Sequence, residues 1–165
     1  MEKTLAHLKT AFAGESQANR KYLAFAKQAE REGLHQVAKL FRAAAEAETV
    51  HAHAHLRAMG AIGSTLDNLK AAVAGETHEF KNMYPEMIAA AKAEGHKAAE
   101  RSFSYANEVE KVHAALYEKA LKDPAGLTET DYHICAVCGY TAEGSTPPDK
   151  CPVCGANQNA FFKSE

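Results

Sequence analysis

The sequence EAETVHA at residues 46–52 decides the fold, because a closely similar sequence, EVEKVHA, follows at residues 108–114. In each copy, a glutamate and a histidine lie three positions apart within an alanine-rich pattern that favours a helix. Residues at positions i and i+3 lie on the same face of a helix. Each copy therefore offers a carboxylate and an imidazole at one point of a helix face.

A second pair of sequences repeats at nearly the same distance: AFAGES at residues 11–16 and AVAGET at residues 72–77. The first pair of copies is offset by 62 residues and the second pair by 61. Residues 1–122 therefore read as a duplicated helical hairpin. Each hairpin contributes one isolated glutamate and one Glu-x-x-His pair.

Two isolated glutamates and two Glu-x-x-His pairs are the ligand set with which a four-helix bundle holds two metal ions close together. The six candidate ligands are Glu15, Glu48, His51, Glu76, Glu110 and His113. Buried carboxylates need a compensating positive charge, which two metal ions supply. Mixed carboxylate and imidazole ligands suit iron or manganese better than calcium. One such pair alone would more simply be a solvated helix face, but two copies in register favour the ligand set.

The composition limits the classes of function. The chain has 165 residues, 46% of them hydrophobic, and its net charge of −2 argues against a nucleic-acid partner. The N-terminus lacks the apolar segment of a signal peptide, and no apolar stretch approaches the ~20 residues of a membrane span. All four cysteines lie within twenty residues near the C-terminus, which favours a metal site over a disulfide framework. We therefore expect a cytoplasmic protein.

Helical periodicity and terminating glycines predict four helices, over about residues 4–32, 35–59, 66–94 and 96–121. Together they form the first predicted domain, residues 1–124. Pro85 lacks a backbone donor, so the third helix should kink just beyond Glu79.

The link between the second and third helices is short. In a ferritin-like bundle these two helices run parallel, so their connection must travel the length of the bundle. Nine residues separate His51 from Gly60 and eleven separate Thr65 from Glu76, which together span about 30 Å of helix. The five steps between Gly60 and Thr65 cover at most ~18 Å. Two arrangements remain. The four helices form an up-and-down bundle in one chain, or the first two helices pair with the last two of a second chain. We favour the second arrangement.

The second predicted domain, residues 131–165, contains CAVCGY at residues 135–140 and CPVCGA at residues 151–156. Two Cys-x-x-Cys pairs are a strong signature of a four-thiolate site, formed by Cys135, Cys138, Cys151 and Cys154. A segment of about 35 residues cannot build an adequate core, so a metal ion must hold it together. A small apolar lining is expected from Tyr132, Tyr140, Phe161 and Phe162. The spacing leaves open a zinc ribbon or a one-iron rubredoxin site.

Together these motifs resemble those of the rubrerythrin family over essentially the whole chain. The marks are GESQAN at residues 14–19, the Glu-x-x-His pairs, GETHE at residues 75–79, MYPE at residues 83–86 and the two Cys-x-x-Cys-Gly sequences. The resemblance implies a mainly α fold, a ferritin-like four-helix bundle with a small rubredoxin-like domain of strands and loops. It also implies two non-haem irons in the bundle and one iron on the four cysteines, for which zinc can substitute.

The resemblance also implies a role for each ligand. Glu48 and Glu110 would bridge the two irons, and one iron would take Glu76 and His113.

The other iron would take Glu15 with either His51 or Glu79, exchanging as the oxidation state changes. A ferric pair tolerates another carboxylate, whereas a ferrous pair suits neutral imidazole. Glu79 is also a candidate proton donor. The simpler alternative for Glu79 is a solvated helix position.

Tyr22 and Tyr84 are candidates to support the ligands by hydrogen bonds, as the resemblance implies. Both positions equally suit an aromatic core residue. His53 should point away from the ligand face, and His55 is expected to be a satisfied bundle histidine.

By resemblance, the protein is a peroxidase that reduces hydrogen peroxide to water in oxidative-stress defence. Electrons from a reductase or rubredoxin would reach the di-iron centre through the four-cysteine iron, across chains in a homodimer. Two other functions compete. A ferroxidase uses a similar bundle but does not need an attached electron carrier, and a zinc-binding interaction module would be colourless and redox-inactive.

Overall fold

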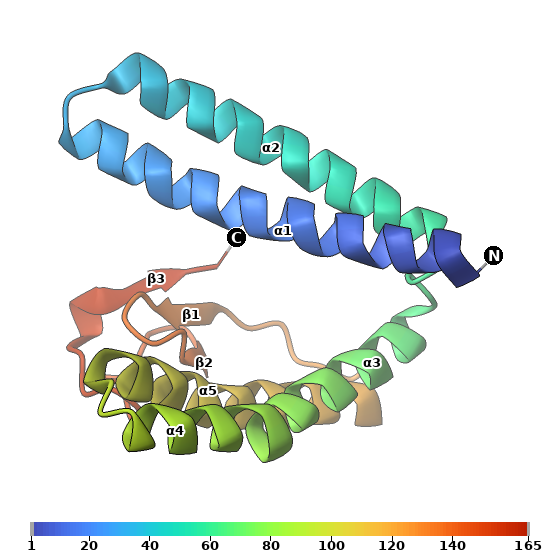
Figure 1. The fold of residues 1–165 in the computed structure, drawn as a ribbon. Coiled ribbons are helices and arrows are strands. Elements are labelled where there is room, and N and C mark those ends of the chain that lie inside the picture. Colours follow the sequence, from blue (N-terminus) through green and yellow to red (C-terminus); the bar gives the residue numbers. More distant parts are fainter. Residues whose placement is uncertain (1, 165) are drawn as a thin grey trace. The chain divides into compact units, whose positions relative to one another are not determined.

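The computed structural model describes residues 2–164, and the chain divides into two compact units between Gly63 and Ser64. The first unit contains α1 (Glu2–Arg31) and α2 (His35–Ala58), shown in Figure 1. The second contains α3 (Thr65–His78), the π-helical turn η1 (Glu79–Met83), α4 (Tyr84–Ala93), α5 (Lys97–Lys122) and a small sheet region. The predicted helix ends agree with these bounds within two residues, and the third predicted helix is divided at η1. None of the helices in the described part of the chain combines the length and apolar character of a membrane span.

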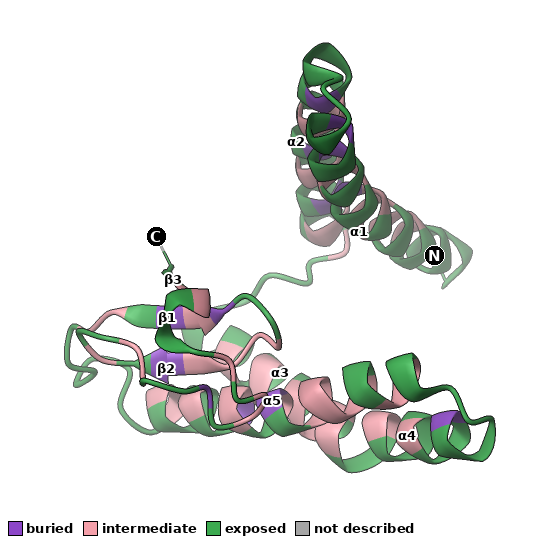
Figure 2. Ribbon diagram, turned by 90° about the vertical axis from the view of Figure 1, so that its left-hand side faces the viewer, coloured by how far each residue is buried: buried purple, intermediate pink, exposed green. Residues whose placement is uncertain are grey.

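The two helices of the first unit pack through a seam of small residues. Ala38, Ala45 and Ala52 recur every seventh position along α2 and are almost completely buried, and Figure 2 shows such buried positions as narrow purple bands. Opposite them, the buried side chain of Asn19 donates from Nδ2 to the Ala45 carbonyl oxygen at 2.7 Å and to Thr49 Oγ1 at 2.9 Å. A seven-residue repeat of small side chains lets two antiparallel helices approach closely, and the asparagine fixes their register.

Larger apolar side chains of the first unit stay outside this seam. Phe25, Leu40 and Val50 are 46%, 68% and 63% exposed. The alanine seam brings the backbones together without using these side chains. The hairpin therefore leaves apolar surface that its own two helices do not cover.

Glycines at equivalent positions of the two repeats end α1 and α4. Gly33 and Gly95, which are 62 residues apart, both have positive φ, at 74° and 69°. After Gly33, the N–H of Leu34 donates to the Ala29 carbonyl oxygen at 2.8 Å; after Gly95, the N–H of His96 donates to that of Ala91 at 2.9 Å. This is the Schellman arrangement, which favours glycine because a Cβ is strained at positive φ.

The second repeat contains one residue more than the first within its helix, and η1 accommodates it. From Glu15 to Gly33 there are 18 positions, whereas from Glu76 to Gly95 there are 19. The Tyr84 N–H donates to the Glu79 carbonyl oxygen, five residues earlier, as in a π-helix. The extra residue explains why the repeat offset changes from 61 to 62. Pro85, which lacks an N–H, follows directly, and the predicted break beyond Glu79 takes the form of this wide turn.

The C-terminal region forms a three-stranded antiparallel sheet in the order β2-β1-β3, comprising β1 (Tyr132–Cys135), β2 (Thr141–Glu143) and β3 (Phe161–Lys163), with the short 3₁₀ turn η2 (Gln158–Ala160) before β3. The predicted apolar lining is only partly correct. The rings of Tyr140 and Phe161 pack edge to face with centroids 6.4 Å apart, but Tyr132 and Phe162 are exposed. Adjacent residues of a strand point to opposite faces, so Phe161 and Phe162 cannot both face one core.

Candidate metal centres

The first unit brings three predicted ligands together. Glu15 on α1 and the pair Glu48 and His51 on α2 have ligand atoms that all lie within 4.8 Å of one another. His51 Nδ1 lies 2.9 Å from Glu48 Oε2, so the i, i+3 spacing places both on one face as predicted. The cluster is open, since the His51 side chain is 57% exposed. His53, two residues further along, is exposed, as expected.

The second unit repeats this arrangement. Glu76 on α3 and the pair Glu110 and His113 on α5 also have ligand atoms within 4.8 Å of one another. His113 Nδ1 lies 2.8 Å from Glu110 Oε2 and 3.8 Å from Glu76 Oε2. The imidazole therefore presents Nδ1 to both carboxylates.

The charges of the second cluster fit a bound cation. Burial raises the pKa of Glu76 above its ordinary value, the nearby charge of Glu110 raises it further, and His113 partly offsets both effects. Two partly buried carboxylates beside one imidazole form a donor set whose repulsion a divalent metal ion relieves. The donor types suit iron.

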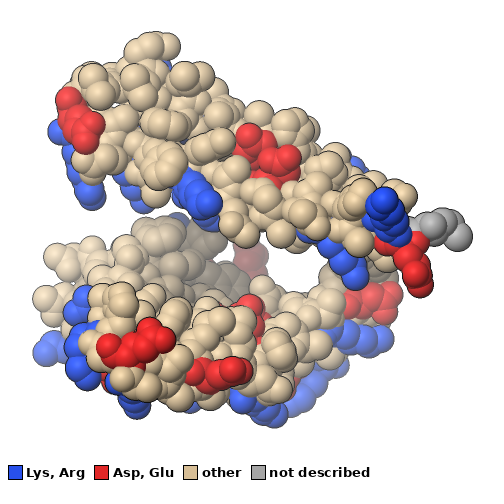
Figure 3. All heavy atoms as spheres, in the orientation of Figure 1, with Lys and Arg blue, Asp and Glu red and all other residues tan. Residues whose placement is uncertain are grey.

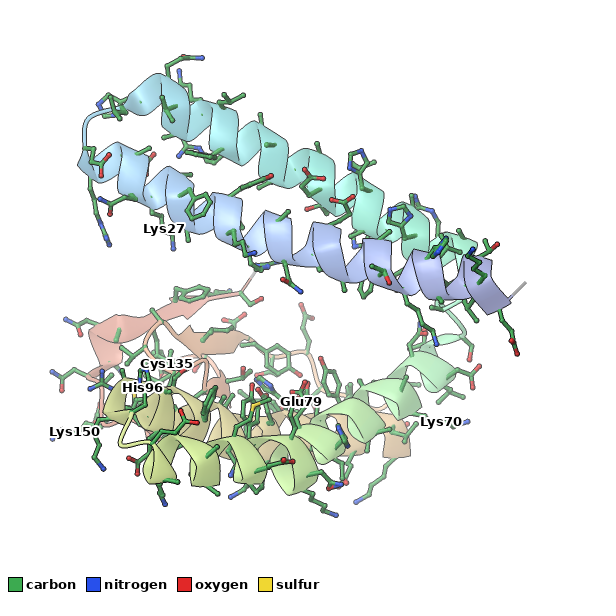
Figure 4. The ribbon with its side chains drawn as sticks, in the orientation of Figure 1. Lys27, Lys70, Glu79, His96, Cys135 and Lys150 are labelled. Atoms are coloured by element: carbon green, nitrogen blue, oxygen red, sulfur yellow. The ribbon has the colours of Figure 1, made fainter. Side chains whose placement is uncertain are left out.

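Glu79 and Tyr84 flank the second cluster. Glu79 is half-buried on the η1 turn, where Figure 4 labels it, and it lies one turn beyond Glu76. The ligand-atom cluster itself consists of Glu76, Glu110 and His113. Burial raises the pKa of the Tyr84 phenol, and the charges of Glu110, Glu79 and Glu76 raise it further. Tyr84 therefore keeps its proton at neutral pH and can donate a hydrogen bond toward the carboxylates.

Tyr22 lies in a different environment. Its ring packs against Phe41 and Phe25, with centroids 6.1 and 6.4 Å away. Tyr22 therefore belongs to a half-buried aromatic cluster of the first unit.

The four cysteines form a third cluster, which includes Cys135 at the end of β1 (labelled in Figure 4). Cys135 Sγ lies 3.7 Å from Cys154 Sγ, and Cys138 Sγ lies 3.4 Å from Cys151 Sγ. Four sulfurs bound tetrahedrally at 2.3 Å would be about 3.8 Å apart, so these side chains need little movement to enclose one ion.

The loops around the sulfurs also fit a metal site. Gly139 and Gly155 follow the two Cys-x-x-Cys pairs with positive φ, at 86° and 75°. Burial raises the pKa of the Cys138 thiol, whereas the backbone N–H of Tyr140 acts in the opposite direction. Thiols crowded this closely favour a cation that displaces their protons.

The sheet region packs on the helix that carries the second pair of ligands. Thr141 Oγ1, at the start of β2, lies 3.1 Å from His113 Nε2. Two residues later, Glu143 accepts two hydrogen bonds of 2.9 Å from Lys119 Nζ, also on α5. Beside this contact is a cavity of about 510 Å³ whose lining includes Glu76 and His113.

Both parts of the chain match models of known families. Residues 7–121 match the rubrerythrin model, and residues 133–162 match the model of the rubrerythrin rubredoxin-like domain. The chain belongs to the rubrerythrin family. Rubrerythrin-2 of Clostridium acetobutylicum is 36% identical over 93% of this chain and 92% of its own length. Nigerythrin of Nitratidesulfovibrio vulgaris is 36% identical over 96% and 85%, respectively.

Solved structures of nigerythrin are also similar to this member of the rubrerythrin family. One, of a partially reduced state, has a TM-score of 0.60 and 35% identity, covering 98% of this chain and 86% of that protein. Another, with the same TM-score and coverages, is of a fully reduced, all-ferrous state, so that protein binds iron. The predicted fold class, mainly α and ferritin-like with a rubredoxin-like C-terminal region, is confirmed. The predicted cofactor types also agree with the ligand groups, which are those of a rubrerythrin.

Sequence reasoning missed the contacts that hold the C-terminal region in place. Thr141 and the pair Lys119 and Glu143 attracted no attention, because none belongs to a motif. His133 received no role, yet it is buried and its Nε2 lies 3.1 Å from the Gly144 carbonyl oxygen. No periodicity or spacing in the sequence could have indicated these partners.

Proposed function

We propose that this rubrerythrin is a peroxidase that reduces hydrogen peroxide to two water molecules, with electrons delivered through the four-cysteine site. The observation that carries the proposal is the contact between the sheet region and α5. One unit of the chain joins a carboxylate and histidine cluster to a rubredoxin-like site through Thr141 and His113. An iron store does not need an attached electron carrier, whereas a peroxidase must be supplied with two electrons for each turnover.

The proposed domains are a di-iron bundle over residues 1–124 and a rubredoxin-like domain over residues 131–165. In the bundle, Glu48 and Glu110 would help to hold both metal ions, Glu76 and His113 would bind one of them, and Glu15 would bind the other. His51 and Glu79 are the alternative further ligands of this second ion. When bound, the metal pair would supply the electrons that cleave the O–O bond.

The reduction also consumes two protons, and the residues around the second cluster can manage them. Tyr84 remains protonated because burial and three carboxylates raise its pKa, so it serves as a donor that steadies the ligands. Glu79, held on a wide helical turn beside the cluster, can carry a proton from solvent. Tyr22 would support the first cluster through its hydroxyl group. The cavity beside Glu76 and His113 gives a molecule as small as peroxide room to enter.

The functional unit is proposed to be a homodimer that exchanges helical hairpins. Each unit holds only three of the six ligands, so neither cluster is a complete di-iron site. The short linker between α2 and α3 supports this proposal, because a crossover between side-by-side parallel helices would have to travel the length of the bundle. A second copy would supply the complementary ligands and cover exposed side chains such as Leu40 and Val50.

The test is a visible spectrum of iron-loaded, anaerobically reduced protein before and after stoichiometric hydrogen peroxide. The red ferric-thiolate colour should return rapidly while the peroxide is consumed. The matched control is His113→Ala, which leaves the four cysteines intact and should regain colour at least tenfold more slowly because electrons lose their acceptor. A wild-type protein that stays reduced while peroxide persists, or a variant that recolours equally fast, would overturn the proposal. Rapid reaction with dioxygen but not with peroxide would indicate a ferroxidase instead.

A further inference from the structure

His113 differs from its repeat equivalent His51 in what surrounds its ring. Both histidines present Nδ1 to the glutamate three residues earlier, at 2.8 and 2.9 Å. The side chain of His113 is 28% exposed, against 57% for His51. The Thr141 hydroxyl also lies 3.1 Å from His113 Nε2. The duplicated ligand pairs are therefore not equivalent.

The neighbours of the Thr141 hydroxyl favour one direction for these hydrogen bonds. Thr141 Oγ1 donates to the Gly139 carbonyl oxygen at 3.3 Å, which uses its single proton. The oxygen lone pairs are then free to accept from His113 Nε2 when that nitrogen carries the proton. A histidine that keeps its proton on Nε2 has a free lone pair on Nδ1 when neutral. In His113 this is the nitrogen that faces Glu110 and Glu76.

The same hydroxyl connects the two metal-binding regions. Gly139 directly follows Cys138, and its N–H donates to the Cys135 carbonyl oxygen at 2.8 Å. Two hydrogen bonds, from His113 to Thr141 and from Thr141 to Gly139, thus lead from a ligand histidine to a cysteine loop.

The strand that carries Thr141 is held in place independently. Thr141 and Glu143 are two residues apart and lie on the same face of β2. Glu143 is paired with Lys119 on α5, one to two turns beyond His113. Val109, one turn before His113, lies near Gly139, where a Cβ would be in ordinary van der Waals contact with Val109 Cγ1, at 3.9 Å. Three positions along α5 therefore contact the loop and strand that follow Cys138.

From this geometry we infer that Thr141 is a positioning residue that fixes His113 with Nε2 protonated and Nδ1 free for the metal ion. It also couples the ligand helix to the cysteine loop of the same chain. The inference rests on the proposed assignment of His113 as a metal ligand, but not on the identity of the oxidant.

Two substitutions of Thr141 distinguish the contribution of its hydroxyl group from that of its side-chain packing. Thr141→Val keeps the shape and removes the hydroxyl, whereas Thr141→Ser keeps the hydroxyl and removes the methyl group. If the hydroxyl matters, Ser should behave as wild type and Val should be impaired; if only packing matters, the order should reverse. Thr128→Val, at an exposed threonine of the linker, is the control for the substitution itself. Thr141→Ala provides a second hydroxyl-free variant if Val does not fold.

The first readout is the imidazole of His113 in full-length, zinc-loaded protein, in which zinc is a diamagnetic probe. Two-bond ¹H–¹⁵N correlation spectra should show Nε2 protonated and Nδ1 bound to zinc in the wild-type, Ser and Thr128→Val proteins. In Thr141→Val, exchange of the Nε2 proton with solvent should be faster by roughly tenfold, as expected for the loss of one hydrogen bond. A zinc-bound Nε2 in the wild type, or unchanged exchange in both hydroxyl-free variants, would overturn the inference.

The second readout is zinc affinity at the carboxylate and histidine ligands, measured by competition with a chelator after the cysteine site is filled. Removing a partner of a ligand histidine typically weakens binding by roughly 10- to 100-fold, and we expect this for Val but not for Ser. Equal affinities for wild type and Val would contradict the inference. Neither readout uses peroxide, so a failure of the peroxidase proposal would leave these results unchanged, and the reverse also holds.

Discussion

At the scale of single residues, the chemistry of the second cluster comes from groups that are unfavourable alone. Glu76 and Glu110 lie beside one imidazole and are only partly exposed. Without a cation, burial and the charge of Glu110 raise the pKa of Glu76. In the metal-free protein at neutral pH, burial and the charge of Glu110 disfavour ionised Glu76 and lower the free energy of unfolding. A bound metal ion would relieve this repulsion.

Replacing Glu76 with glutamine should stabilise the metal-free protein at neutral pH. An acid whose pKa is raised on folding contributes its full stability below its unfolded pKa, and this contribution is lost as the pH rises through the folded pKa. The free energy of unfolding of Glu76→Gln should thus equal that of the wild type at about pH 4 and exceed it increasingly toward pH 7. Urea unfolding of both metal-free proteins across this range is the measurement. Parallel pH profiles would show that Glu76 does not carry this effect.

The two candidate tyrosines should respond differently to loss of their hydroxyl groups. Tyr84 lies in the field of three carboxylates, whereas the Tyr22 ring packs between Phe25 and Phe41. Tyr84→Phe should therefore lower peroxide turnover by roughly tenfold or more, and Tyr22→Phe should have a smaller effect. Steady-state rates with matched iron content test this. An equal loss in both variants would assign the same role to both hydroxyls.

At the scale of elements, the duplicated hairpins differ because one helix contains an extra residue. The η1 turn places Glu79 and Tyr84 on either side of a five-residue hydrogen-bonded loop. The first repeat has a regular helix over the corresponding positions, ending in its own Schellman glycine. A single insertion thus changes the side chains presented near one cluster and leaves the hairpin connections unaltered.

Deleting the exposed residue Lys81 should convert η1 into a regular α-helical turn. The helix content should be unchanged by circular dichroism, because the deletion restores the length of the first repeat. The Tyr84 N–H would then bond the Glu79 carbonyl oxygen as an ordinary i→i+4 pair, so Glu79 would lose the displaced backbone position that the wide turn gives it. We expect peroxide turnover to fall to the level of Glu79→Ala, measured in parallel. Wild-type turnover in the deletion variant would mean that the wide turn is not required.

At the scale of the whole molecule, the proposed exchange of hairpins rests on the distribution of the candidate ligands. Each unit provides one cluster of three ligands, and the first also leaves large apolar side chains exposed. Acidic and basic side chains are intermixed on the side of each unit that Figure 3 shows. Exchange of hairpins between two copies would complete two di-iron sites at once.

Complementation between inactive variants distinguishes an exchanged dimer from a single-chain bundle. His51→Ala and His113→Ala each remove one ligand from every site, so each protein alone should be inactive. If hairpins are exchanged, co-refolded mixed dimers contain one intact site and one doubly impaired site. Random mixing should then restore about a quarter of the wild-type sites, detected by iron content and peroxide turnover. No recovery after co-refolding would show that each site is built from one chain.

The sequence alone determined the types and spacing of the ligands, the helix bounds within two residues and the four-thiolate site. These features obey local rules: an i, i+3 pair shares a helix face, a glycine ends a helix, and Cys-x-x-Cys brings two sulfurs together. They hold whatever the rest of the chain does, so a single sequence is enough to read them.

Only the tertiary structure decided which side chains meet across elements. The approach of Thr141 to His113 joins residues 28 positions apart, and the exposure of Tyr132 and Phe162 depends on how the sheet lies against its surroundings. The wide turn at η1 arises because the extra residue is accommodated within the helix by a π-helical hydrogen bond and does not lengthen a loop. These contacts depend on how side chains pack throughout the unit, and such packing produces no periodic pattern in the sequence.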